Sequence, residues 1–346
     1  MTFNRAIFAV FAILLTLSMS VAQTMPAKTP AAGTPEKVEL KIDRQDPALD
    51  KLVPPDAVAY RVARDFIFIE GPIWIPSGKH LLFSDTRGNR IYKYDPSKNS
   101  LEVFRDKSGY AGDDIANYVE PGTNGLTLDP QGRLTMCQHG NRRVVRLDAN
   151  GSETVLADRF EGKRLNSPND LVYRKDGTLY FTDPAYGLRR VQGDPPKELD
   201  YMGVYALRNG KLSTVATDQT NPNGIALSPD EKSLYVGVGR VLMRYPVNAD
   251  GSTGAGTAFF DMSSSGAQRG GIDGLKVDVQ GNRYVTGPGG VWIISASGKH
   301  LGTITLPEQP ANVGWGDDDG RTLYFTARTS LYKVRMNVPG YGRFGR

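Results

Sequence analysis

Six short segments of the sequence begin with a side chain that carries an oxygen atom. The six residues are Glu70, Asn124, Asn169, Asn223, Asp273 and Asn312. In each segment a Gly or an Asp usually follows, and an apolar strand pattern comes next. Carboxylate and amide oxygens are the ligands that hard divalent cations prefer, Ca²⁺ first and Mg²⁺ or Mn²⁺ after it. These residues can form such a site only if the fold brings them to one place.

Each segment opens a repeated unit of strands. In NDLVYRKDGTLYFTD, which starts at Asn169, a strand is followed by a glycine-containing turn and a second strand. Glycine at such turns supplies the left-handed backbone that a tight hairpin needs. A third strand pattern follows every pair, and a fourth short one follows five of the six. The units start roughly 40 to 55 residues apart, which is typical of a four-stranded propeller blade.

The repeats predict an all-β fold, a six-bladed β-propeller over residues 55–337. The sixth unit lacks a fourth strand, whereas an unpartnered strand pattern at residues 58–65 precedes the first unit. We expect this N-terminal strand to complete the last blade and close the propeller. The first strand of each blade lies nearest the axis, so the six oxygen-bearing residues should form a ring around one end of the central channel.

The composition of the ring favours one bound divalent cation, most simply Ca²⁺. Two carboxylates in a narrow channel would repel each other without a cation. Zn²⁺ would be expected to recruit His or Cys, although acidic sites accept it when it is abundant. Asn-Gly and Asp-Gly are also ordinary turn dipeptides, which would account for Asn124 or Asn312. They do not account for Glu70, because Glu is a poor turn residue.

The ends of the chain differ in composition from the repeats. Residues 1–22 combine a basic end, a short apolar run and a small-residue cleavage site, as in an export signal. The run is shorter than the roughly 20 residues that span a bilayer, so no stable membrane insertion is expected after cleavage. Residues 23–54 and 338–346 lack apolar periodicity and are predicted to be a flexible linker and a flexible tail. The mature protein is expected in the periplasm or outside the cell.

Other features narrow the function classes. The formal net charge of +5 includes no block of like charges, and no nucleic-acid-binding motif accompanies it. The single cysteine, Cys137, lies in an apolar strand pattern and is expected to be buried and structural. There is no G-x-S-x-G elbow, so a covalent nucleophile is not indicated. The expected partner is a small-molecule substrate, and no protein or nucleic-acid partner is inferred.

From about Val58 to Arg335 the sequence resembles the SMP-30/gluconolactonase family. The motifs that carry the resemblance are EGPIW, TNGLTLDPQGRLTMCQHGNRRV, RLNSPNDLVYRKDGTLYFTDPAYGL, NPNGIALSPD and GIDGLKVD. RLNSPND followed by FTDPAYGL is particular to the bacterial gluconolactonase-like branch. The resemblance implies that Glu70, Asn223 and Asp273 are metal ligands and that Asn169 reaches the metal or the substrate. It also implies that Asp273 acts as the general base that activates water.

The resemblance extends to the mouth of the pocket, where a second group of residues is expected to bind substrate. These residues are Asn124, His139, Asn166 and Tyr186. His139 could contact the substrate or transfer a proton, or it could instead satisfy loop backbone groups. Animal members carry a sugar-contacting arginine two residues before the asparagine that matches Asn169. Here Ser167 takes that place, which leaves the substrate open.

Three functions are compatible with this sequence. The leading hypothesis is an exported, Ca²⁺-type hydrolase that opens a sugar lactone such as glucono-1,5-lactone to its aldonic acid by metal-activated water. A second keeps the site but changes the substrate to another ester, a hydrophobic lactone or a phosphotriester. A third is a non-catalytic propeller that binds a ligand. Glu70, Asn223 and Asp273 together argue against the third, because a scaffold does not need them.

Overall fold

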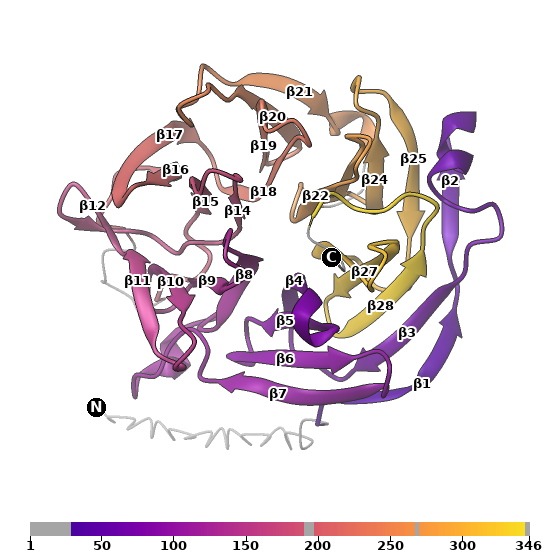
Figure 1. Ribbon diagram of the computed structural model, residues 1–346, viewed down its shortest axis with the longest axis horizontal. Helices are drawn as coiled ribbons and strands as arrows, with labels where there is room; N and C mark the ends of the chain where they lie inside the picture. The colour runs from indigo at the N-terminus through magenta and orange to yellow at the C-terminus, as the bar shows by residue number, and fades with distance from the viewer. Residues whose placement is uncertain (1–28, 190–196, 267–269, 343–346) are drawn as a thin grey trace, which may run out of the picture.

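The computed structural model describes residues 29–189, 197–266 and 270–342, which form an all-β propeller (Figure 1). Six antiparallel sheets of four or five strands stand around a central channel. Each sheet is one blade, and its strands follow one another from the channel to the rim. The predicted fold class is confirmed.

The first three blades each contain four consecutive strands of the chain. Blade one contains β4 (Ile69–Ile75), β5 (His80–Asp85), β6 (Arg90–Asp95) and β7 (Ser100–Asp106). Blade two contains β8 (Thr123–Leu128), β9 (Leu134–Gln138), β10 (Arg143–Leu147) and β11 (Glu153–Ala157). Blade three contains β14 (Leu171–Tyr173), β15 (Leu179–Asp183), β16 (Met202–Arg208) and β17 (Lys211–Gln219). A small hairpin, β12 (Arg159–Phe160) with β13 (Lys163–Arg164), lies between blades two and three.

Blade four is built in the same way, whereas blades five and six recruit N-terminal strands. Blade four contains β18 (Pro222–Leu227), β19 (Ser233–Val238), β20 (Val241–Pro246) and β21 (Thr257–Asp261). Blade five contains β22 (Leu275–Val277), β23 (Arg283–Gly287), β24 (Gly290–Ile294), β25 (His300–Thr305) and, outermost, β2 (Lys41–Arg44). Blade six contains β26 (Asn312–Gly316), β27 (Thr322–Ala327), β28 (Ser330–Arg335), β3 (Ala59–Arg64) and, outermost, β1 (Ala31–Val38).

The last blade is completed by the N-terminal strand, as predicted. Strand β3 pairs antiparallel with β28, with Ala63 opposite Leu331 and Ala59 opposite Val334. Because residues near the two ends of the folded chain share one sheet, the ring of blades is closed by hydrogen bonds.

The expectation of a flexible linker at residues 23–54 is wrong from residue 31 onward. Strand β1 extends blade six, β2 extends blade five, and the short 3₁₀ helix η1 (Pro47–Lys51) follows. Leu49, Leu52 and Val53 are buried in the apolar cluster shared by blades five and six. The segment has too few apolar residues to show a strand period in the sequence. Strands β1 and β2 form because they pair with the edges of β3 and β25, which would otherwise be open. We therefore expect removal of residues 29–54 to destabilise the protein.

The predicted flexible tail also has structure where it is described. Val338 is buried, Gly340 forms an isolated bridge with Asp278, and the Tyr341 N–H donates to the Val277 carbonyl at 2.8 Å. Residues 338–342 thus cross from blade six to blade five. The rest of the tail, residues 343–346, and the export signal at residues 1–22 lie outside the described part of the chain.

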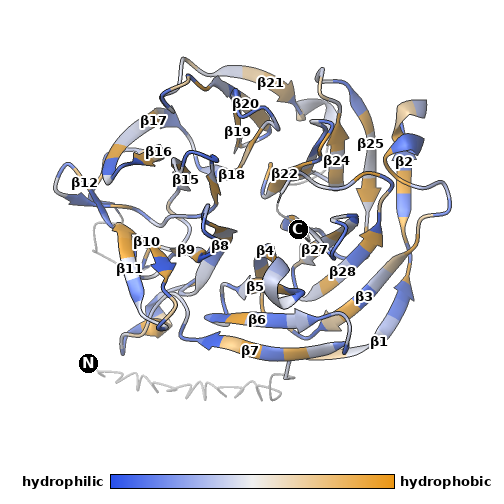
Figure 2. Cartoon of the chain, viewed as in Figure 1, coloured by the Kyte–Doolittle hydropathy of each residue, from blue (hydrophilic) through white to orange (hydrophobic). Residues whose placement is uncertain are grey.

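The core lies between neighbouring blades. Apolar and polar residues alternate along many strands, as the banding in Figure 2 shows, because successive side chains point to opposite faces. Large aromatic side chains fill the gaps, as where Trp74 of blade one stacks on Tyr324 of blade six, with ring centroids 6.5 Å apart. Cys137 is buried among such side chains, as expected. No helix among the described residues is long and apolar enough to cross a membrane.

Candidate functional site

The six oxygen-bearing residues all occupy the start of the innermost strand of a blade. Glu70, Asn124, Asn223 and Asn312 lie in the first two residues of β4, β8, β18 and β26. Asn169 and Asp273 lie two residues before β14 and β22. All of these strands run in the same direction along the channel, so their first residues gather at one end of it.

Glycines after the ring residues bring neighbouring innermost strands close together. A Cβ atom on Gly125 would lie 2.6 Å from the Asn169 carbonyl oxygen, and one on Gly224 would lie 2.2 Å from the Asp273 carbonyl oxygen. The amides of these two glycines donate to the same carbonyls. Neither glycine has a positive φ. These Asn-Gly pairs are therefore sites of close backbone approach rather than turns, which removes the turn explanation for them.

The ring side chains lie close enough to influence one another. The Asn312 side chain lowers the pKa of Glu70, and the Asn223 side chain lowers the pKa of Asp273, both against the larger effect of burial. Burial, followed by the charge of Asp273, raises the pKa of Tyr186, which comes from the connection after β15. Tyr186 therefore lies near Asn223 and Asp273, two of the predicted metal ligands.

The two ring carboxylates are electrostatically coupled. Burial, followed by the charge of Asp273, raises the pKa of Glu70 well above its usual value. Burial, followed by the charge of Glu120, raises the pKa of Asp273 to about 7. The charge of Asp170 raises both pKa values further. A bound cation would stabilise both carboxylates in their ionised form, so the donor set fits a divalent cation.

The donor set is made of oxygen atoms. Within the described residues there is no cluster of three or more His, Cys, Asp or Glu side chains that could hold a metal ion. The ring supplies two carboxylates, Glu70 and Asp273, and the amide oxygens of Asn169 and Asn223. This composition matches Ca²⁺ or Mg²⁺ better than Zn²⁺.

His139 lies beside the ring, next to Asn169. Its side chain is fully buried, and burial lowers its pKa to about 3, so it is uncharged at neutral pH. Its Nε2 lies 3.4 Å from Nδ2 of Asn169. This contact places His139 directly behind the Asn169 amide, where it restricts the orientation of that side chain.

Asn166 and Ser167 are both buried at the connections around β15. Nδ2 of Asn166 donates to the carbonyls of Asp183 at 3.1 Å and Tyr201 at 2.9 Å. Ser167 donates to the Pro184 carbonyl at 2.6 Å. Binding of substrate by Asn166 remains a prediction, and its amide nitrogen is already used to hold these connections together. Asn124 lies in the ring, as predicted, and is almost completely buried.

Three charged residues near the ring were missed by the sequence analysis. Asp170 is buried next to Asn169, and its Oδ2 lies 3.7 Å from Nζ of Lys276. Glu120 lies four residues before Asn124, and its Oε2 is 3.8 Å from Nδ1 of His139. For Lys276 a signal was available, because a charged residue in an innermost strand must face either the channel or a blade interface. Glu120 lies in a long loop, where no strand period in the sequence indicates which way a side chain faces.

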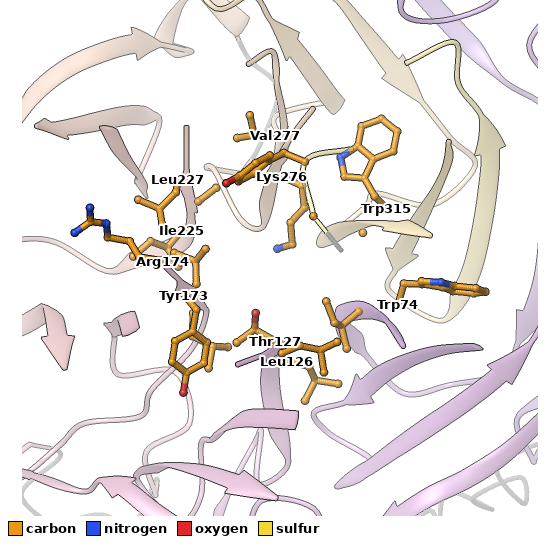
Figure 3. A pocket seen from close by; sticks show the side chains of 18 of the residues that line it. Trp74, Leu126, Thr127, Tyr173, Arg174, Ile225, Leu227, Lys276, Val277 and Trp315 are labelled. Carbon is orange, nitrogen blue, oxygen red and sulfur yellow. The ribbon is translucent and has the colours of Figure 1, made fainter. Parts of the chain in front are cut away.

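The opposite end of the channel is an apolar cavity of about 240 Å³ (Figure 3). It is lined by residues that follow the ring positions along the innermost strands, among them Leu126, Ile225 and Leu227. The Lys276 side chain points into the cavity (Figure 3), and its Nζ lies 3.7 Å from Oδ2 of Asp170. Tyr341 of the C-terminal segment contributes to its wall. Four charged residues, Arg174, Lys175, Glu231 and Lys276, are among its lining, and none of the six ring residues is.

The fold and the ring define a β-propeller with an oxygen-lined site on its axis. The family model described as SMP-30/Gluconolactonase/LRE-like region matches residues 68–329, and the chain belongs to this family. It is 34% identical over 315 residues to a gluconolactonase of Zymomonas mobilis subsp. mobilis, covering 87% of each chain. It is 27% identical to the pentonolactonase XacC of Haloferax volcanii, covering 74% of this chain and 80% of that one.

A solved gluconolactonase of Xanthomonas campestris has the same architecture. Its structure superimposes with a TM-score of 0.76 at 30% sequence identity, covering 88% of this chain and 98% of that one. The resemblance inferred from the sequence motifs is confirmed by these comparisons.

Proposed function

We propose that this protein, a lactone hydrolase by its family and relatives, opens a sugar lactone such as glucono-1,5-lactone to the aldonic acid with the help of one bound divalent cation. The observation that carries the proposal is the pair of coupled carboxylates, Glu70 and Asp273, within an axial ring of oxygen donors. The lactonase relatives support the class of substrate.

The cation would be held by Glu70, Asn169, Asn223 and Asp273, with Ca²⁺ the preferred ion. Four protein ligands leave positions for water and substrate, because Ca²⁺ takes six to eight oxygens. When bound, such a cation polarises a carbonyl group and lowers the pKa of water. Mg²⁺, Mn²⁺ and Zn²⁺ are the alternatives to test.

The residues of the chain would divide the remaining work. Asp273 would accept the proton of the attacking water. Burial, followed by the charge of Glu120, raises its affinity for a proton in the metal-free protein. Asn223 lowers the pKa of both Asp273 and Tyr186 and would therefore sit between them as a polar neighbour of both. His139 acts through Asn169 rather than on the substrate, since it is buried and uncharged.

The proposal is tested by a substrate panel assayed with and without a chelator. Purified mature protein should hydrolyse glucono-1,5-lactone, lose this activity with excess chelator, and regain it when Ca²⁺ is added back. An aryl ester and a phosphotriester complete the panel, and Asp106→Asn, an exposed rim carboxylate, is the matched control for Asp273→Asn. Full activity after metal removal would overturn the metal-dependent mechanism.

We also propose that the protein is exported and acts in the periplasm or outside the cell. The basic and apolar pattern of residues 1–22 supports this location. Fractionation of cells that express the full chain, with mass spectrometry of the mature N-terminus, tests it. A protein that keeps residues 1–22 and stays in the cytoplasm would refute export.

A further inference from the structure

The cavity at the end of the channel away from the ring is enclosed by all six blades. Its lining includes residues from every innermost strand, β4, β8, β14, β18, β22 and β26. Tyr341 and Gly342 of the C-terminal segment line it as well. Its volume of about 240 Å³ exceeds the roughly 150 Å³ of an engineered apolar cavity that binds benzene. A ligand with a single aromatic ring therefore fits into it.

The wall of this cavity is mainly apolar. Among its lining residues are Leu126, Ile225, Leu227 and Val277 (Figure 3). Solvent reaches the interior, because the side chain of Lys276, which points into it, is 24% exposed. A ligand body that packs against these apolar side chains is removed from water, which favours binding.

Two polar side chains from different blades point into this apolar interior. Lys276 comes from β22 in blade five and Thr127 from β8 in blade two, and both point toward the middle of the cavity (Figure 3). Sites for small ligands are typically apolar pockets in which a few polar groups converge and fix the orientation of the ligand. The cavity has this composition.

The ammonium group of Lys276 keeps donors for a ligand. Its Nζ donates to the Leu275 carbonyl at 3.1 Å and lies 3.7 Å from Oδ2 of Asp170. The second distance is too long for a hydrogen bond, and among the described residues Oδ2 of Asp170 has no hydrogen-bond partner. An ammonium group has three N–H donors, so the single bond to Leu275 leaves others for a ligand.

Trp315 adds another donor to the wall. Its side chain is almost completely buried, and within the described part of the chain its Nε1 has no hydrogen-bond partner. A buried N–H group without an acceptor is unusual, because the loss of its contact with water is not compensated. The indole of Trp315, the ammonium of Lys276 and the hydroxyl of Thr127 can all donate. A ligand that complements them carries an acceptor.

The charges around the cavity favour an anionic acceptor. Arg174 and Glu231, two other charged residues of the lining, compensate each other, with Nε of Arg174 3.7 Å from Oε2 of Glu231. Asp170 is buried and is not part of the lining, so a ligand meets the ammonium of Lys276 rather than this carboxylate. Hydrogen bonds from an ammonium group to a carboxylate are stronger than those to a neutral acceptor.

We propose that this cavity is a second binding site, separate from the ring, for a small carboxylate with an aromatic body. The carboxylate accepts hydrogen bonds from Lys276 and Thr127, and the aromatic body packs against Leu126, Ile225 and Leu227. Binding involves no covalent step and does not use the cation of the ring, so the inference is independent of the proposed function. A ligand that contacts all six blades should stabilise the propeller.

The test compares phenylacetate with phenylacetamide, a neutral molecule of nearly the same shape, by titration calorimetry of the purified protein. We expect phenylacetate to bind with a Kd of about 10 µM to 1 mM, and phenylacetamide about tenfold or more weakly. Excess phenylacetate should raise the melting temperature by roughly 2–4 °C. It should leave lactone hydrolysis unchanged, whereas inhibition competitive with the lactone would place the ligand at the ring and overturn the inference.

Two variants separate the charge of the site from its space. Lys276→Met removes the cation and keeps an apolar chain, so phenylacetate should bind about tenfold or more weakly and phenylacetamide within about threefold of the parent. Thr127→Phe fills the cavity and keeps Lys276, so it should abolish binding of both molecules. Lys211→Met, at an exposed position of β17, is the matched control and should bind as the parent does.

Thermal unfolding without ligand shows whether each variant is folded. If Lys276→Met does not fold, the difference between the two molecules in the parent and the loss of binding in Thr127→Phe still decide the question. Equal affinity for phenylacetate and phenylacetamide, binding that survives in folded Thr127→Phe, or a Kd above about 10 mM for phenylacetate would each overturn the inference.

Discussion

The two ends of the central channel are built by the same six strands and have opposite character. At the end where the innermost strands begin, carboxylates and amides gather around the axis, and burial raises the pKa values of Glu70 and Asp273. A few residues further along the same strands, Leu126, Ile225 and Leu227 line a cavity that Tyr341 helps to close. The difference shows that a propeller needs only one exceptional position per blade to create a reactive site.

One ion pair connects the two ends. Asp170 is buried directly behind the ring, and Lys276 reaches it at 3.7 Å from the cavity side. The negative ring and the apolar cavity therefore share a boundary made of opposite charges. Substitutions at the ring end should change activity, whereas substitutions at the cavity end should change only the free energy of unfolding.

The largest expected effect is at the ring. Asp273→Asn should reduce kcat/KM for a sugar lactone by roughly a thousandfold or more, because a metal ligand and a proton acceptor are lost together, each worth several kcal/mol. The thermal midpoint of the metal-free variant should stay near that of the parent, since the ring does not form the blade cores. Steady-state kinetics with saturating Ca²⁺ and calorimetric unfolding measure both. Retention of most activity would remove Asp273 from the mechanism.

The boundary between the two ends is tested by Lys276→Met. Loss of the cation leaves the buried Asp170 carboxylate without its opposite charge, which should lower the free energy of unfolding by about 1–3 kcal/mol. The double variant Lys276→Met with Asp170→Asn should recover part of this loss in a double-mutant cycle by denaturant unfolding. Strict additivity of the two single effects would show that the pair is not coupled.

A smaller effect on activity is expected behind the ring. His139→Ala should lower kcat/KM about tenfold to a hundredfold, because Asn169 loses the contact that orients its amide. His139→Gln offers an acceptor oxygen in the same region and should lose less. Calcium affinity measured by calorimetry should weaken in the same order. Equal losses in both variants would argue against orientation of Asn169 as the role of His139.

At the cavity end, Tyr341→Ala should affect stability and leave activity unchanged. The Tyr341 ring lies 5.6 Å from Nζ of Lys175, and its hydroxyl lies 3.4 Å from Oε1 of Glu231. Loss of these contacts should cost about 1–2 kcal/mol in the free energy of unfolding. A drop in kcat/KM without loss of stability would show that the two ends communicate.

The smallest expected effect is a pH dependence of stabilisation by Ca²⁺. The folded-state pKa values of Asp273 and Glu70 are raised, so the metal-free native state binds protons more tightly than the unfolded chain does. Asp273 and Glu70 therefore stabilise the metal-free native state at acidic pH, and this contribution is lost as the pH rises from about 4 through about 7. A bound cation offsets this loss, so Ca²⁺ should raise the melting temperature by roughly 2–4 °C more at pH 8 than at pH 5. Scanning calorimetry at both pH values, with Asp273→Asn as the control, checks the sign.

The sequence by itself determined the six blades, the closing strand and the ring. Repeats, turn glycines and alternating strands are local signals, and Glu70 through Asn312 recur at equivalent points of the repeat. It also indicated the chemistry of the ring, because the types of oxygen-bearing side chain are readable without coordinates.

Only the tertiary structure decided which partners the polar residues near the ring find. His139 and Asn166 lie in motifs close to the ring, and both are buried, His139 against Asn169 and Asn166 against the Asp183 carbonyl. Glu120 lies beside Arg87 and His139 because a long loop, anchored to blade one and to Arg189, carries it there. Residues 31–54 read as a linker because their order depends on open edges of strands that are distant in sequence. Local pattern fixes which strand a residue belongs to, whereas the direction and partners of a loop side chain depend on contacts that no local period encodes.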